Sequence, residues 1–306
     1  MGTIVVLLDS DINAPQPALA KAVQIARAKG SLLSVYVNAY SGPLVRAVGS
    51  DKAHLERARS QVMAGWEKQL RRMLDKLDAG DTETHIFWEH AEAPALAEFI
   101  TRTSPSLIIL HRVQEPLLKR LLITPRDWRV IRKAPCPVLC VGEQPWSKTP
   151  FVLAAVDPDH DDAEDDLNSN IVATAKTLSQ WVGGNGGLAH VVEYPDETLI
   201  MLAGEAVPVS LSNIDALRTF YWQRLLECAN HYGVDPDSAV MLEGAPHRAL
   251  AEHMAEHPGI LVLGTVHRGA LRRLLLGSTA EQILLHSDSD VLVVKPSGFS
   301  SPWQQN

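Results

Sequence analysis

The sequence repeats itself once, at the length of a whole domain. The run Ala-Leu-Ala-Glu at residues 95–98 recurs at 249–252, an offset of 154 (252 − 98), and Tyr40 and Tyr194 stand at the same offset. A repeat this long is typical of a duplicated domain and not of a solenoid. The chain of 306 residues is therefore expected to hold two similar domains, at 1–145 and 150–298.

Short apolar runs alternate with helical patterns along each half of the chain. In the first half the apolar runs lie at 4–8, 32–37, 84–88, 107–110 and 138–141, and the helical patterns at 17–29, 56–77, 93–103 and 127–133. Runs without a polar break are typical of parallel strands that are buried on both faces. We predict an α/β protein of two tandem doubly wound domains, each with a five-stranded parallel sheet and helices on both faces.

The second half contains a strand, a glycine-bounded loop and a helical pattern between residues 260 and 285. Gly264 would let the backbone leave the strand sharply, and Gly277 would let it approach a ligand. Ser278 or Thr279 is expected to cap the helix, with Glu281 completing a capping box. Turn glycines and a helix cap would be an ordinary explanation. Their place after a buried strand favours an anion site at the helix N-terminus.

The spacing of Gly264 and of Gly277-Ser278, thirteen residues on (277 − 264), resembles the nucleotide loop G-x2-G-x9-G-[ST] of the universal stress protein family. His267 departs from it by standing at the middle glycine, where its side chain contacts phosphate, points away from it or crowds the loop. The resemblance covers nearly the whole chain. It implies a stress-response protein that binds an adenine nucleotide, ATP, alone or with Mg²⁺. It implies that the ligand contacts Asp157, Pro158, Val191, Gly264, Thr265, His267, Arg268, Gly277, Ser278 and Thr279.

The first half lacks this loop. At the positions of Gly264, Gly277, Ser278 and Thr279 it carries His111, Thr124, Pro125 and Arg126. Proline has no N–H to offer a phosphate, so we predict that the equivalent cleft is closed or has another use. Single-domain relatives pair through their last strands, so the resemblance also implies an internal pseudo-dimer of the two domains. A further homodimer is left open.

Composition argues against several classes of partner. The net charge of −8 disfavours nucleic acid and anionic membranes, and no apolar stretch is long enough to span a membrane. Residues 1–8 are interpreted as a strand and not as a signal peptide. Three cysteines give no disulfide framework, which favours a cytoplasmic protein.

The chain has no recognisable catalytic motif, so at most slow ATP hydrolysis is expected. The acidic run at 159–166 could hold a divalent cation but is more typical of a solvated loop. His85, His90 and His111 could place a metal in the first cleft, if they converge. The alternative to an ATP-binding stress protein is a nucleotide-free scaffold, or a binder of another small molecule or metal through the cleft of the first domain.

Overall fold

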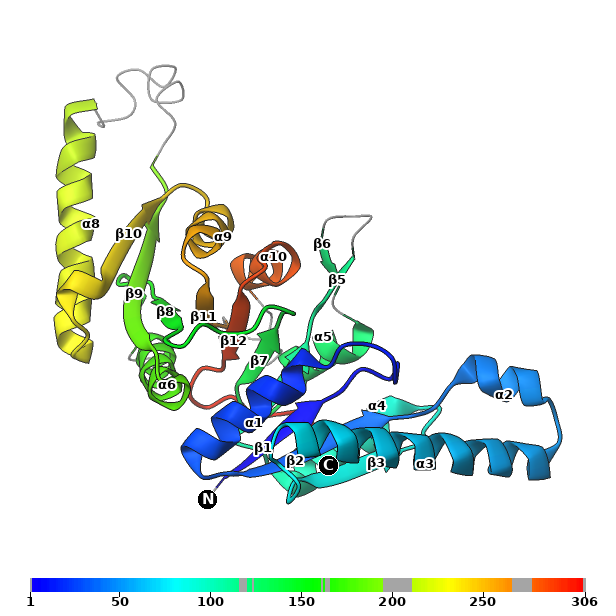
Figure 1. Ribbon diagram of the computed structural model, residues 1–306. Helices are drawn as coiled ribbons and strands as arrows, with labels where there is room; N and C mark the ends of the chain where they lie inside the picture. Colours follow the sequence, from blue (N-terminus) through cyan, green and yellow to red (C-terminus); the bar gives the residue numbers. More distant parts are fainter. Residues whose placement is uncertain are drawn as a thin grey trace, which may run out of the picture. The chain divides into compact units, whose positions relative to one another are not determined.

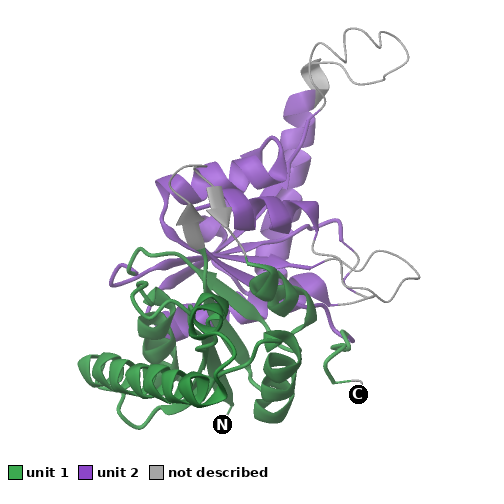
Figure 2. Cartoon of the chain, turned by 90° about the vertical axis from the view of Figure 1, so that its right-hand side faces the viewer, with its two compact units in different colours: residues 1–145, 299–306 green, residues 146–298 purple. Residues whose placement is uncertain are grey.

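The computed structural model describes residues 2–115, 120–122, 124–160, 162, 166–194, 211–265 and 277–304. The chain divides into two compact units, Met1–Pro145 with Phe299–Asn306, and Trp146–Gly298 (Figure 2). Each unit has a parallel five-stranded sheet (Figure 1). Across the described ranges, no helix combines the length and the apolar character needed to cross a membrane.

The first unit has the strand order β7-β4-β1-β2-β3. Its strands are β1 (Thr3–Leu7), β2 (Leu32–Asn38), β3 (Glu83–Phe87), β4 (Leu107–His111) and β7 (Val138–Val141). Its helices are α1 (Pro17–Lys29), α2 (Gly42–Val48), α3 (Lys52–Lys76), α4 (Glu92–Thr103) and α5 (Pro125–Lys133). A small antiparallel hairpin, β5 (Val113–Glu115) with β6 (Arg120–Leu122), follows β4.

The second unit has the strand order β10-β9-β8-β11-β12, which is the same topology when strands are counted along the chain. Its strands are β8 (Phe151–Ala155), β9 (Asn185–Val192), β10 (Ala239–Glu243), β11 (Gly259–Gly264) and β12 (Asp290–Val294). Its helices are α6 (Leu167–Val182), α8 (Leu211–Tyr232), α9 (Pro246–Glu256) and α10 (Ser278–His286), and a 3-10 turn, η2 (Pro236–Ser238), precedes β10.

Burial along the strands confirms the doubly wound class. Every residue of β4 and of β12 is buried, which requires helices on both faces of each sheet. The first helix of each unit also ends alike. Gly30 and Gly183 follow α1 and α6 with φ of 65° and 67°, a left-handed conformation that favours glycine.

The structure adds elements that the sequence did not indicate. Helix α2 and the hairpin of β5 and β6 were not predicted. Helix α3 begins at Lys52 and not at residue 56, because the Asp51 carboxylate accepts hydrogen bonds from the N–H groups of Ala53 and His54 at 2.9 and 3.0 Å. The packing of the two domains as a pseudo-dimer stays a prediction.

Adjacent glycines in β9 should respond in opposite ways to a methyl group. At Gly186 the new carbon would lie 3.7 Å from Ser179 Oγ, an ordinary contact, whereas at Gly187 it would lie 2.5 Å from the Ser238 carbonyl oxygen. We expect Gly186→Ala to stabilise the chain by about 0.5–1 kcal/mol and Gly187→Ala to destabilise it by about 1–3 kcal/mol. Urea denaturation of both variants checks this, and shifts of the same sign would contradict it.

Candidate functional site

A cavity of about 350 Å³ lies at the carboxyl edge of the second unit's sheet. Its walls come from the ends of β8, β9 and β11 and from the first turns of α6, α9 and α10. It is lined by Ala155, Val156, Asp157, His160, Leu167, Asn168, Ile171, Ala189, His190, Val191, Pro246, Leu250, Leu263, Gly264, Gly277, Ser278, Thr279 and Ala280. Ligands of open α/β sheets bind at this edge.

The cavity brings together six of the predicted site residues: Asp157, Val191, Gly264, Gly277, Ser278 and Thr279. Pro158 is next to Asp157, and its carbonyl accepts a hydrogen bond from Arg224. Thr265 is buried and does not line the cavity, because its N–H and its hydroxyl both donate to the carbonyl of Val294, at 3.0 and 3.3 Å. His267 and Arg268 lie outside the described residues.

The first turn of α10 forms part of the cavity wall, and its capping differs from the prediction. Gly277 is the N-cap, and among the described residues no side chain caps the helix, so the expectation of a Ser278 or Thr279 cap is wrong. Glu281 is the fourth helical residue, one position beyond a capping box. The N–H groups at the start of the helix therefore receive no side-chain cap from the described part of the chain, and the helix dipole favours negative charge at this wall of the cavity.

Gly264 is required by packing and not by a sharp turn. It still pairs with Val294 as the last residue of β11, so the expected departure of the backbone at this residue is wrong. A methyl group at Gly264 would lie 2.7 Å from Leu167 Cδ1 and 2.9 Å from Ile171 Cδ1. The missing side chain thus lets α6 lie close against the end of β11 and shapes this side of the cavity.

Asn168 is a cavity residue that the sequence analysis missed. Its side-chain amide pairs with both backbone groups of Asp157: Oδ1 accepts from the N–H at 3.1 Å, and Nδ2 donates to the carbonyl at 2.7 Å. The side chain is 5% exposed, so water competes little for these bonds. Asn168 holds the backbone of Asp157 in place. No sequence signal marked it, because its partners are main-chain atoms eleven residues away.

His190 was also missed. Its Nδ1 lies 3.2 Å from the carbonyl oxygen of Val156. A carbonyl oxygen only accepts hydrogen bonds, so Nδ1 is the donor in this contact. The ring is buried against Tyr221, with ring centres 6.0 Å apart. His190 therefore lines the cavity with one ring nitrogen bonded to the main chain just after β8.

Two residues of the acidic run after β8 make contacts within the second unit. The Asp162 carboxylate accepts from the N–H groups of Asn168 and Ser169, both at 2.8 Å, and so caps α6. Asp159 pairs with Arg224 at 3.2 Å. In the described part of the chain, no three His, Cys, Asp or Glu side chains are grouped to hold a metal ion, and this includes His85, His90 and His111.

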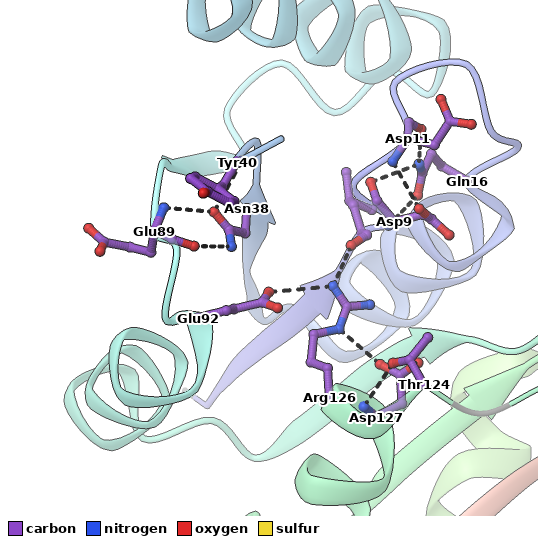
Figure 3. Close-up of polar contacts among 11 residues, drawn as sticks. Asp9, Asp11, Gln16, Asn38, Tyr40, Glu89, Glu92, Thr124, Arg126 and Asp127 are labelled. Atoms are coloured by element: carbon purple, nitrogen blue, oxygen red, sulfur yellow. Dashed lines mark hydrogen bonds and ion pairs between the residues drawn. The ribbon is translucent and has the colours of Figure 1, made fainter. Parts of the chain in front are cut away.

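The first unit has an ion pair where the second has its cavity. Glu92 is the first residue of α4 and corresponds to Pro246, the first residue of α9 in the second unit. Arg126 is the second residue of α5 and corresponds to Thr279, the second residue of α10. Pro246 and Thr279 line the cavity of the second unit. In the first unit, Arg126 Nη1 lies 3.7 Å from Glu92 Oε1, as Figure 3 shows. An ion pair thus crosses the equivalent cleft.

Arg126 is held on two further sides (Figure 3). Its Nη1 donates to the carbonyl of Leu8 at 2.9 Å, and its Nε donates to Asp127 Oδ1 at 3.0 Å. Asp127 also accepts from the hydroxyl of Thr124 at 2.7 Å. Burial raises the pKa of Glu92, and the nearby Arg126 charge opposes that shift. The helix start that could receive phosphate in the second unit carries an internal cation here.

His111 ends β4 as Gly264 ends β11, and it is only 7% exposed. Within the described residues, neither ring nitrogen has a hydrogen-bond partner. Burial lowers the pKa of His111. Glu143, Asp9 and Asp127 act to raise it, and Lys21 acts to lower it. The pKa of His111 is lower in the folded chain than in the unfolded chain. As the pH falls, His111 therefore binds a proton in the unfolded chain first.

Stability should therefore fall as pH drops below the usual histidine pKa of about 6.5 and continue to fall to the folded pKa. His111→Gln cannot take up this proton. We expect the advantage of the wild type over this variant to shrink between pH 7.5 and pH 5, as measured by urea denaturation. A constant difference would contradict this.

The family profile described as the universal stress protein family matches residues 1–142 and 152–295. The chain belongs to the universal stress protein family, whose members are stress-response proteins. A universal stress protein E homolog from Haemophilus influenzae is 29% identical over 298 residues, covering 93% of this chain and 94% of the relative. Universal stress protein E of Photorhabdus laumondii is 28% identical, with 94% and 93% covered. A functionally unknown protein from Pseudomonas aeruginosa PAO1 shares the fold, with a TM-score of 0.71, 23% identity, and 98% and 94% covered.

Proposed function

We propose that the second unit binds ATP and that the chain acts in the cytoplasm as a nucleotide-dependent signalling or protective factor in the stress response. The observation that carries this proposal is that one cavity is lined by Asp157 and Val191 together with Gly264, Gly277 and the start of α10. Its volume of about 350 Å³ falls within the range of small-molecule sites.

The chemistry of the walls supports a ligand with two different ends. The first turn of α10 has N–H groups that no described side chain caps, and such groups suit phosphate oxygens. Just after β8, the carboxylate of Asp157 is an acceptor at the cavity wall, which suits the hydroxyls of a ribose. ATP has both ends. It would serve there as a bound signal, alone or with Mg²⁺, and this chain would supply the contacts.

Mass spectrometry of small molecules released from the purified, denatured protein tests this proposal. Adenine nucleotide should be released from the wild-type chain and not from Gly277→Val purified in parallel. Release of a different small molecule, or of none, would favour the alternative of a nucleotide-free scaffold or a binder of another ligand. Equal release from both proteins would place the nucleotide elsewhere.

A further inference from the structure

Helix α8 is joined to the ligand cavity by a continuous chain of hydrogen bonds. The hydroxyl of Tyr232, at the end of α8, donates to Asp162 Oδ2 at 2.8 Å. The same carboxylate holds the first turn of α6 through the N–H of Asn168, and Asn168 holds both backbone groups of Asp157. Asn168 and Asp157 both line the cavity.

A second connection from α8 reaches the same loop. Arg224 Nη2 donates to the carbonyl of Pro158 at 3.0 Å and lies 3.2 Å from Asp159 Oδ1. Pro158 follows Asp157 directly, so this bond fixes the backbone next to the cavity. Two side chains of α8 therefore hold the stretch from Asp157 to Asp162 at both of its ends.

We propose that Tyr232 and Arg224 are positioning residues for the ligand cavity. Through them, α8 fixes the position of Asp157 and so determines the affinity for the nucleoside end of the ligand. This inference rests on the proposed ATP site and adds its regulation: whatever displaces α8 changes the nucleoside contact, and bound ATP in turn favours the docked α8. The phosphate end, at α10, takes no part in this chain of bonds.

The chain offers a matched control. Lys176, on α6, donates from Nζ to the carbonyls of Tyr232 and Gly233 and so ties α6 to the same end of α8. It does not line the ligand cavity. Lys176→Met therefore removes a contact between the same two helices without touching the chain that leads to Asp157.

The test compares wild type, Tyr232→Phe and Lys176→Met by calorimetric titration with ATP and with inorganic tripolyphosphate. We expect Tyr232→Phe to weaken ATP binding about 3- to 10-fold, the usual effect of one hydrogen bond. Tripolyphosphate binding should be the same in wild type and Tyr232→Phe, and Lys176→Met should keep the wild-type ATP affinity. Unchanged ATP affinity in Tyr232→Phe, or an equal loss for both ligands or in both variants, would overturn the inference.

Amide exchange separates this inference from the proposed function. The N–H groups of Asn168 and Ser169 should exchange faster in Tyr232→Phe than in wild type, whether or not ATP is present. A wild-type chain that binds no ATP would contradict the proposed function. Amide exchange would then test the connection between α8 and the cavity by itself. Faster exchange in Tyr232→Phe supports this connection, and unchanged exchange overturns it.

Discussion

Replacing Gly277 with valine is expected to weaken ATP binding about a hundredfold, which corresponds to the upper range of overpacking costs. Gly277 lines the cavity and is the N-cap of α10, immediately before the N–H groups proposed to receive phosphate. A branched side chain at this point crowds the anion. Calorimetric titration with ATP measures the loss.

The same substitution should leave the fold nearly intact. Gly277 has φ of −59° and ψ of 148°, a conformation open to any residue, so valine introduces no backbone strain. The loss of a glycine N-cap costs less than about 1 kcal/mol. Gly277→Ala is the matched control, with the same change of cap and a smaller side chain, and it should bind ATP better than Gly277→Val. Retained affinity in Gly277→Val would remove Gly277 from the site.

Replacing Arg126 with methionine is expected to destabilise the first unit by about 3 kcal/mol at pH 7.5, near the lower end for a broken buried ion pair. Methionine keeps much of the volume but leaves Asp127, which is buried, without its guanidinium partner. It also leaves Glu92 without a neighbouring cation. Lys133→Met, an exposed change on the same helix, should cost less than about 0.5 kcal/mol.

The pH dependence of that loss identifies its cause. Burial already raises the pKa of Glu92, and removal of the Arg126 charge removes a factor that lowers it. A carboxyl group whose pKa is higher in the folded state than in the unfolded state binds a proton first in the folded state. Lowering the pH therefore neutralises Glu92 in the folded variant and recovers part of the lost stability. The loss in Arg126→Met should therefore be smaller at pH 5 than at pH 7.5. Urea denaturation at both values measures it, and an equal or larger loss at pH 5 would contradict this account.

The fold was predictable where strands are short apolar runs between helical patterns. The runs at 107–110 and 138–141 became β4 and β7, and their repeats became β11 and β12. Helix α2 and the hairpin of β5 and β6 escaped because elements of 7 and 3 residues are too short to show a period. The N-cap of α10 was predicted wrongly because a glycine followed by two hydroxyl residues offers several possible capping positions. In the structure the N-cap is Gly277.

The candidate site was predictable only where a residue type carried its own signal. Gly264 and Asp157 at strand ends, and Gly277, Ser278 and Thr279 at a helix start, could be placed from sequence, and all of them line the cavity. Asn168 and His190 could not, because their partners are backbone carbonyl and N–H groups that only the folded sheet brings near. The loss of the loop at Arg126 was visible, but its ion pair with Glu92, 34 residues away (126 − 92), was not.

Calorimetric titration of ATP into the intact wild-type chain tests the central claim most directly, because it counts sites as well as measuring affinity. The second unit has a cavity at the start of α10, and the first has Arg126 across the equivalent cleft. We therefore predict one ATP bound per chain, with the affinity about a hundredfold weaker in Gly277→Val and unchanged in Arg126→Met. Two equal sites, or none, would contradict this account.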